Sequence, residues 1–135
     1  MTVFVDTSAL YALLDADDAH HAEARAAWQR LEAAEATLVT HSYVLVETIA
    51  LVQHRLGLAA VRALVDAVGP LLTVVWVTAP LHEEALAATL AANARHLSLV
   101  DQVSFLVARR RGCDAVWAFD DDFERAGFTR FAALA

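Results

Sequence analysis

The sequence predicts an α/β fold of three layers, in which helices cover both faces of a central, mainly parallel sheet of four to five strands. Short β-branched and aromatic runs alternate along the chain with longer helical patterns, and this order favours right-handed crossovers between parallel strands. The 135 residues are 59% hydrophobic, which permits a large core for this length. They contain no repeat, low-complexity segment or linker, so we expect a single domain over residues 1–135.

The first third of the chain supplies two strands and two helices. Val3–Val5 is a short apolar run before a polar turn, which indicates a buried strand. Ser8–Leu14 follows as a short helix, and Ala19–Glu35 is a longer amphipathic helix with charges between its apolar positions. Thr37–Thr40 is the second predicted strand.

The middle of the chain is predicted to be mostly helical. Tyr43–Leu56 is a helix that stops at Gly57, a residue type that commonly ends helices. Leu58–Val68 is expected as a further helix, and Gly69 and Pro70 end it.

The last part of the chain returns to alternation. Leu72–Val77 is the third strand, and two helices follow it at Leu81–Asn93 and Val100–Arg111. Ala115–Phe119 is the fourth strand, and Phe128–Phe131 is a candidate for a short fifth one.

Composition excludes several classes of protein. A net charge of −7 argues against a general nucleic-acid coat protein, although metal-binding acids can give a nuclease the same sign. The single cysteine, Cys113, rules out an intramolecular disulfide and a multi-cysteine metal site. We expect no signal peptide and no membrane span, and therefore a cytoplasmic protein.

Two aspartates follow predicted strands and should meet at one edge of the sheet. Asp6 directly follows the first strand, and Asp120 follows the fourth. In parallel α/β sheets the binding crevice lies beyond the carboxyl ends of the strands. Asp6 alone is explained equally well as a helix N-cap. Because Thr7 or Ser8 could cap that helix instead, we expect Asp6 to be the first carboxylate of a site.

Two further acids lie on predicted helices. Asp101 fits a capping box with Ser98, yet its helical neighbours place it at the border of the buried face. Glu47 stands among apolar residues, and no basic residue lies three or four positions away to pair with it. A buried carboxylate without a partner is costly, so we expect Glu47 to have a functional reason to be there.

The run from Asp120 to Asp122 lies between Phe119 and Phe123 at a strand end. Crowded carboxylates raise one another's pKa values unless a cation compensates, so at least one should face a ligand. Together the acids form an oxygen-rich, nitrogen-poor set, which suits Mg²⁺ or Mn²⁺ better than zinc. The six histidines form no zinc pattern, and none is assigned a role.

Four short motifs resemble those of the PIN-domain family, specifically its VapC-type toxin ribonucleases. They are "VDTSAL" at 5–10, "THSYVLVETIAL" at 40–51, "LSLVDQVSF" at 97–105 and "AFDDDFERAGF" at 118–128. The resemblance covers nearly the whole chain. Each motif is weakly specific, but their order and their placement on the predicted elements are together quite specific.

The resemblance implies a metal-dependent endoribonuclease that is the toxin of a type II toxin–antitoxin system, with a cognate antitoxin as partner and a homodimer as the common state. Asp122 is a further candidate ligand, and Thr7 or Ser8 matches the hydroxyl that follows the first acid in the family. Gln102 is a mild departure from the family pattern. The family's acidic quartet carries over onto Asp6, Glu47, Asp101 and Asp120.

The chemistry of phosphodiester hydrolysis suits this assignment, because carboxylate-held Mg²⁺ activates water and neutralises phosphoryl oxygens. Our hypothesis is that Asp6, Asp101 and Asp120 hold the main ion. Glu47, with Asp122 as a further candidate, would complete a second site or orient the water. RNA binding should therefore depend on divalent ions, with Mn²⁺ as a substitute for Mg²⁺.

Phosphates outside the metal site need cations, and all ten basic residues are arginine. The run Arg109, Arg110 and Arg111 is the candidate RNA contact, because the planar guanidinium suits phosphate. The alternative is a soluble helix end that the helix dipole favours.

Other classes fit less well. A haloacid dehalogenase-type phosphatase needs a second Asp at position 8, where this chain has Ser8. A receiver domain or a P-loop hydrolase needs a lysine, and the chain has none. The open alternative is a binding module that keeps the PIN fold with weak or lost catalysis. The sequence does not select an RNA target.

Overall fold

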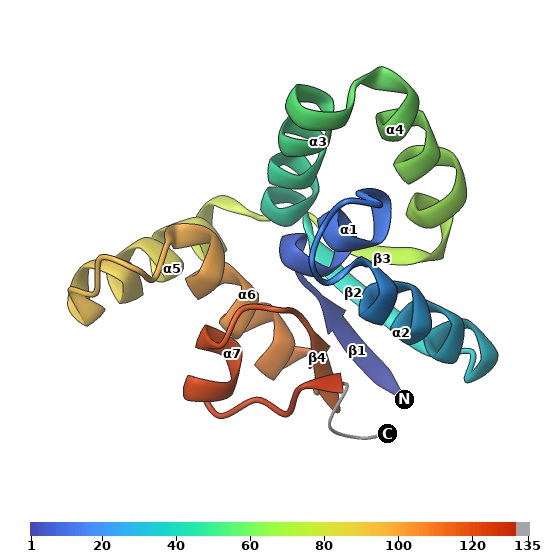
Figure 1. Ribbon diagram of the computed structural model, residues 1–135. Coiled ribbons are helices and arrows are strands. Elements are labelled where there is room, and N and C mark those ends of the chain that lie inside the picture. Colours follow the sequence, from blue (N-terminus) through green and yellow to red (C-terminus); the bar gives the residue numbers. More distant parts are fainter. Residues whose placement is uncertain (132–135) are drawn as a thin grey trace.

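The computed structural model describes residues 1–131 and confirms the predicted fold class. Four strands form one fully parallel sheet in the order β3-β2-β1-β4 (Figure 1). Parallel pairing requires a crossover between successive strands, which the helices supply. The strands are β1 (Thr2–Val5), β2 (Thr37–His41), β3 (Leu72–Val75) and β4 (Ala115–Trp117).

Helices connect the strands and follow the last one. A π-helical turn, Leu64–Val68, and a 3₁₀ turn, Gly69–Leu71, lie between α4 and β3. The helices are α1 (Thr7–Leu14), α2 (His21–Ala33), α3 (Ser42–Leu56), α4 (Leu58–Ala63), α5 (Ala79–Ala92), α6 (Leu99–Arg110) and α7 (Asp122–Arg125).

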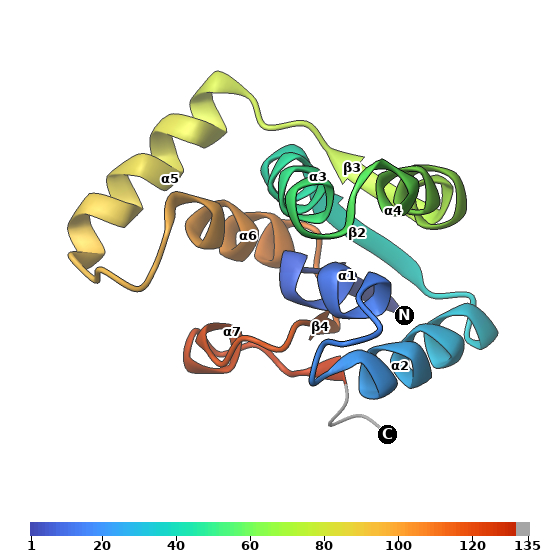
Figure 2. The ribbon, with the colours of Figure 1, turned by 45° about the horizontal axis from the view of Figure 1, so that its top comes forward.

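The strand order explains the layers. The steps from β1 to β2 and from β2 to β3 run in one direction, so right-handed connections place α1 to α4 on the same face. The chain then returns across the sheet to β4, which places α5 and α6 on the other face (Figure 1). Figure 2 shows α3 and α4 as a helical hairpin, and α5 projecting beyond the sheet while it packs on α6.

The core lies around β1, β2 and β4, whose residues are mostly buried, whereas β3 is only partly buried. Val3, Phe4 and Val5 of β1 are completely buried, as expected for a strand covered on both faces. The backbone N–H of Asp6 donates to the carbonyl of Trp117 at 3.1 Å, which extends the pairing of β1 and β4 by one residue. The carboxyl ends of these two strands are therefore held side by side.

Two expectations about elements need correction. The predicted fifth strand at Phe128–Phe131 is wrong as a strand, because only Arg130 forms a parallel bridge, to Val116. The predicted helix Leu58–Val68 changes to a π-helical turn at Leu64, next to the Gly69–Pro70 break. The other predicted elements exist with ends shifted by one or two residues. In the part of the chain that the structure describes, no helix is long and apolar enough to cross a bilayer.

Candidate active site

Asp6 lies buried at the carboxyl end of β1. The backbone N–H and the hydroxyl of Ser8 both donate to its Oδ2, at 3.1 Å and 2.7 Å. Burial raises the pKa of the Asp6 carboxyl from 3.8 to about 6, the Ser8 hydrogen bonds oppose this, and the negative charges of Asp101 and Asp120 add to it. Three carboxylates from separate elements are thus close enough to affect one another.

The prediction of which residue caps α1 is wrong. We expected Thr7 or Ser8 to cap the helix and Asp6 to be free of that task, but Asp6 is itself the N-cap. The reason is geometric: Asp6 keeps the extended backbone of β1, with φ −96° and ψ 160°, whereas Thr7 is already helical. Both hydrogen bonds from Ser8 end on Oδ2 of Asp6, and neither uses Oδ1. The same carboxylate can therefore cap the helix through one oxygen and serve the site through the other.

Ser8 connects Asp6 to the acidic loop after β4. Its Oγ accepts a hydrogen bond from the backbone N–H of Phe119 at 2.9 Å while it donates to Asp6. Phe119 immediately precedes Asp120, whose Oδ1 accepts the backbone N–H of Asp122 at 2.9 Å. One hydroxyl thus joins the Asp6 carboxylate to the backbone directly before Asp120.

Asp101 reaches the same region from α6. The predicted capping box with Ser98 is confirmed, with hydrogen bonds of 2.9 Å and 3.1 Å in the two directions. Partial burial raises the pKa of the Asp101 carboxyl, the Ser98 bonds oppose it, and the charges of Asp120 and Asp122 add to it. Asp101 therefore completes the capping box of α6 and also acts electrostatically on the other acids.

Glu47 does not behave as the sequence suggested. The premise that it is buried among apolar residues is wrong, because its side chain lies on an exposed face of α3 together with Val46 and Ala50. Val46 itself is 63% exposed. Apolar neighbours in the sequence indicate burial only if another element covers that helix face. The role of Glu47 as a ligand stays a prediction without that support.

Sequence reasoning missed His41, which is fully buried between β2 and α3. Its Nδ1 accepts the N–H groups of Tyr43 and Val44, so an imidazole caps α3. Its Nε2 lies 2.8 Å from Oγ of Ser104, which donates to the carbonyl of Val100. Burial lowers the pKa of His41 to about 4, which keeps the ring neutral for this role. The available signal was a histidine at a strand end directly before a helix.

The arginine run lies at the other end of α6 from Asp101. Arg109 is eight residues further on, or about 12 Å along the helix axis. Its guanidinium packs over the rings of Phe105 and Phe128, and Arg110 pairs with Glu84 of α5. Two of the three predicted RNA contacts are therefore engaged within the protein, and their contact with RNA stays a prediction.

The donor set fits a hard divalent cation chemically. Asp6, Asp101 and Asp120 supply only oxygen, and burial with mutual repulsion is the situation that a bound cation relieves. Within residues 1–131, however, no three side chains of His, Cys, Asp or Glu stand as a ready ligand set. A shared ion would therefore require rotation of these side chains.

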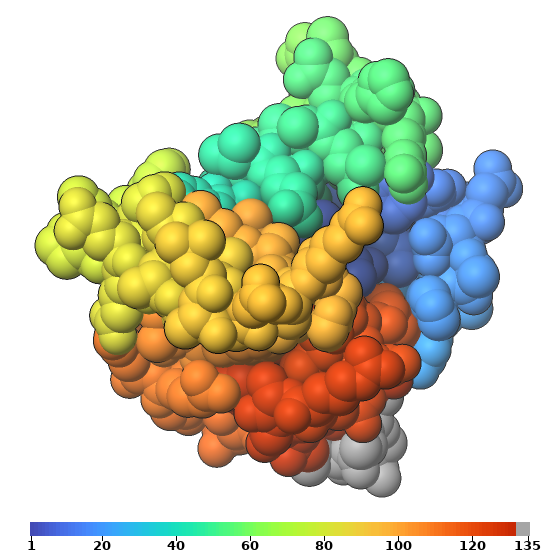
Figure 3. Space-filling model, turned by 90° about the vertical axis from the view of Figure 1, so that its left-hand side faces the viewer, coloured from blue at the N-terminus to red at the C-terminus, as the bar shows by residue number. Residues whose placement is uncertain are grey.

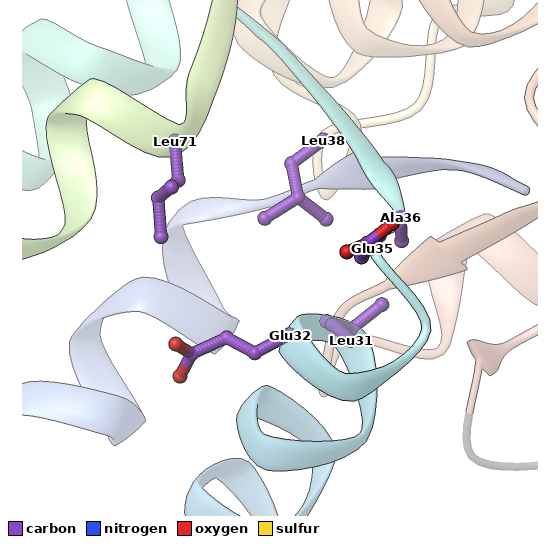
Figure 4. Close-up of a pocket in the computed structure, with 6 residues that line it drawn as sticks. All are labelled: Leu31, Glu32, Glu35, Ala36, Leu38 and Leu71. Atoms are coloured by element: carbon purple, nitrogen blue, oxygen red, sulfur yellow. The ribbon is translucent and has the colours of Figure 1, made fainter.

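A cavity lies away from these acids. A cavity of about 270 Å³ opens at the amino end of the sheet, between the end of α2, the start of β2 and the turn before β3 (Figure 4). Leu38 and Leu71 face each other across it, with Glu32 at its border. None of the predicted site residues lines this cavity.

The fold and the acids define a class: a parallel α/β protein with convergent carboxylates at the carboxyl end of the sheet. The PIN domain family model matches residues 3–129. The 23S rRNA-specific endonuclease VapC20 from two strains of Mycobacterium tuberculosis is 39% identical over 127 residues, which are 93% of this chain and 95% of that protein. The chain therefore belongs to the PIN-domain family.

Solved structures agree with this assignment. The crystal structure of Mycobacterium tuberculosis VapC20, a sarcin–ricin loop cleaving toxin, aligns with a TM-score of 0.80 over 94% of this chain and 96% of that chain. VapBC2 from Rickettsia felis, bound to a DNA fragment from its promoter, aligns with a TM-score of 0.64 at 13% identity over 96% of both chains. The second likeness shows the fold alone.

Proposed function

We propose that this chain is a divalent-metal-dependent endoribonuclease, the toxin of a type II toxin–antitoxin pair, and that it cleaves ribosomal RNA. The observation that carries the proposal is the position of Asp6 and Asp120 after β1 and β4, where the Ser8 hydroxyl joins Asp6 to the backbone next to Asp120. The charge of Asp101 on α6 also acts on Asp6. The 39% identity to a 23S rRNA-specific endonuclease over nearly the whole chain supports the substrate class.

The proposed roles follow from how each side chain is held. Bound Mg²⁺ or Mn²⁺ would supply water activation and neutralise charge on the phosphate. Asp6, Asp101 and Asp120 would hold the ion, with Asp6 fixed by Ser8 and Asp101 by its capping box. Outer hydrogen bonds of this kind orient ligands and keep them in place. Glu47, exposed on α3, is the candidate to orient the water or to complete a second site.

A direct test uses an RNA hairpin with the sequence of the sarcin–ricin loop and a second hairpin with a scrambled loop. We expect the purified chain to cleave the first in Mg²⁺ or Mn²⁺ and to be inactive in EDTA. Sequencing of the product ends would locate the cleaved bond. A folded protein that leaves both hairpins intact at millimolar metal would contradict the proposal.

The alternative is a PIN-fold binding module with weak or lost catalysis. The observation in its favour is that residues 1–131 present no ready set of three metal ligands. Titration with Mn²⁺ by calorimetry separates the two candidates, because the module requires no ion. Absence of divalent binding at millimolar concentration would favour it over the nuclease.

Protein partners are part of the proposal: a cognate antitoxin, and a second copy in a homodimer, acting in the cytoplasm as one domain. Their support is the apolar surface, since Trp76 is 69% and Leu90 is 72% exposed, and Ala85 is the one buried residue of α5. Light scattering of the chain, alone and with the product of the neighbouring reading frame, tests both associations.

A further inference from the structure

Asp122 differs from the other acids of the site in its partners. Its side chain is buried at the start of α7, yet its Oδ1 lies 3.2 Å from Nη1 of Arg125 and 3.8 Å from Nε2 of His96. Arg125 belongs to α7 itself, whereas His96 comes from the loop between α5 and α6. The Asp122 carboxylate thus lies beside an arginine and a histidine that come from different segments.

These partners distinguish Asp122 from Asp6. The bonds to Asp6 come from a hydroxyl and an amide of Ser8, which carry no positive charge, and its neighbours are other acids. Asp122 already has a guanidinium and an imidazole beside it. A metal ion at Asp6 would compensate charge that has no basic partner, whereas at Asp122 it would have to compete with Arg125.

The two basic side chains face outward beside the acids. The side chain of His96 is 63% and that of Arg125 is 69% exposed, while that of Asp122 is 10% exposed. The position is next to the site, because the backbone N–H of Asp122 donates to Oδ1 of Asp120 at 2.9 Å. Figure 3 shows this face: yellow-orange atoms of the α5–α6 connection meet red atoms of the C-terminal segment, near blue atoms of the N-terminal segment.

We propose that Asp122 holds His96 and Arg125 as a phosphate-binding pair for RNA, rather than serving as a metal ligand. The proposal rests on the ribonuclease function above and specifies how that site accepts a polyanion. RNA approaching a group of carboxylates needs nearby cations for its phosphates. Arg109 and Arg110 are engaged with aromatic rings and Glu84 at the far end of α6, whereas this pair borders the acids.

The first test measures RNA affinity without cleavage. In an Asp6→Asn background with Mn²⁺ present, fluorescence anisotropy follows binding of the sarcin–ricin hairpin. We expect His96→Ala and Arg125→Ala each to weaken binding by about fivefold and to make it less dependent on salt, as loss of a phosphate contact does. The matched control is Arg62→Ala, an exposed arginine on α4, which should bind like its parent.

The second test asks whether Asp122→Asn strengthens or weakens RNA binding. Removing a negative charge near RNA should by itself strengthen binding. The proposal predicts the opposite for Asp122→Asn, a loss of about two- to fivefold, because His96 and Arg125 lose the group that holds them. The affinity for Mn²⁺, measured by calorimetry in the otherwise unchanged chain, should stay within about twofold of the parent value.

Several results would overturn the proposal. Tighter RNA binding by Asp122→Asn, or a large loss of its Mn²⁺ affinity, would make Asp122 a repulsive group or a metal ligand. The proposal would also fail if His96→Ala and Arg125→Ala bound RNA like the parent while Arg111→Ala bound it weakly. The phosphate contact would then be assigned to the arginine run. Both histidine and arginine side chains are exposed, so these variants test the proposal even if Asp122→Asn misfolds. If the chain with Asp6 intact neither binds nor cleaves the hairpin, the ribonuclease function fails as well.

Discussion

The two ends of the sheet differ in what they offer a ligand. At the carboxyl end, Asp6 and Asp120 follow β1 and β4, and Asp101 joins them from α6. At the amino end, Leu38 and Leu71 border a cavity of about 270 Å³. This cavity is lined mainly by apolar side chains, whereas the reactive carboxylates lie at the opposite end of the strands. The proposed functional side chains lie at the carboxyl ends of the parallel strands, as is usual in such sheets, and not in the cavity at the amino end.

The strongest test of this difference is cleavage by Asp101→Asn. The amide oxygen can still accept the N–H of Ser98, so the cap of α6 should survive. We expect cleavage to fall by more than about 100-fold, beyond the usual cost of losing an outer hydrogen bond to a metal ligand. The control is Glu32→Gln at the amino-end cavity, which should cleave like wild type. If both variants lost cleavage activity equally, the two ends of the sheet would not differ in function.

The second test is the pH dependence of stability in EDTA. The pKa of Asp6 is raised to about 6 in the folded state from 3.8, so protonation is easier when the chain is folded. The stabilising effect is present below pH 4 and is lost as the pH rises towards 6. Asp6→Asn should therefore be more stable than wild type by about 2 to 3 kcal/mol above pH 6, and equally stable near pH 3. Urea unfolding measures this, and a difference independent of pH would contradict it.

The third test concerns the amino end. Leu38 is buried, but its side chain borders an existing cavity, so truncation removes fewer contacts than at a closed position. We expect Leu38→Ala to lower the free energy of unfolding by about 2 kcal/mol, at the low end for such changes. Cleavage by the folded variant at low temperature should equal that of wild type. A selective loss of cleavage would show that this end takes part in function.

The smallest expected effect is at Glu47. Because Glu47 is exposed, Glu47→Gln should leave the urea midpoint unchanged. A water-orienting role predicts a decrease of about tenfold in cleavage, equivalent to about 1.4 kcal/mol. A decrease as large as that of Asp101→Asn would place Glu47 among the metal ligands. No decrease would remove it from the site.

Local patterns in the sequence were enough to find most of the elements. The β-branched run at Val3–Val5 and the capping box of Ser98 and Asp101 depend on neighbours in the chain, and both are confirmed. The element ends were less accurate, because hydrogen bonds from other segments decide them. Ser8 is an example: its hydroxyl receives the N–H of Phe119, 111 residues away in the sequence.

The sequence by itself determined the alternation of strands and helices, and so the parallel sheet and the edge where Asp6 and Asp120 meet. Only the tertiary structure decided which polar and charged side chains are buried and which of them lie next to one another. It left Glu47 exposed, buried His41, and gave Asp122 two basic partners. The physical reason is that secondary structure follows from backbone geometry and local periodicity. Burial and charge compensation depend instead on which elements pack against a side chain.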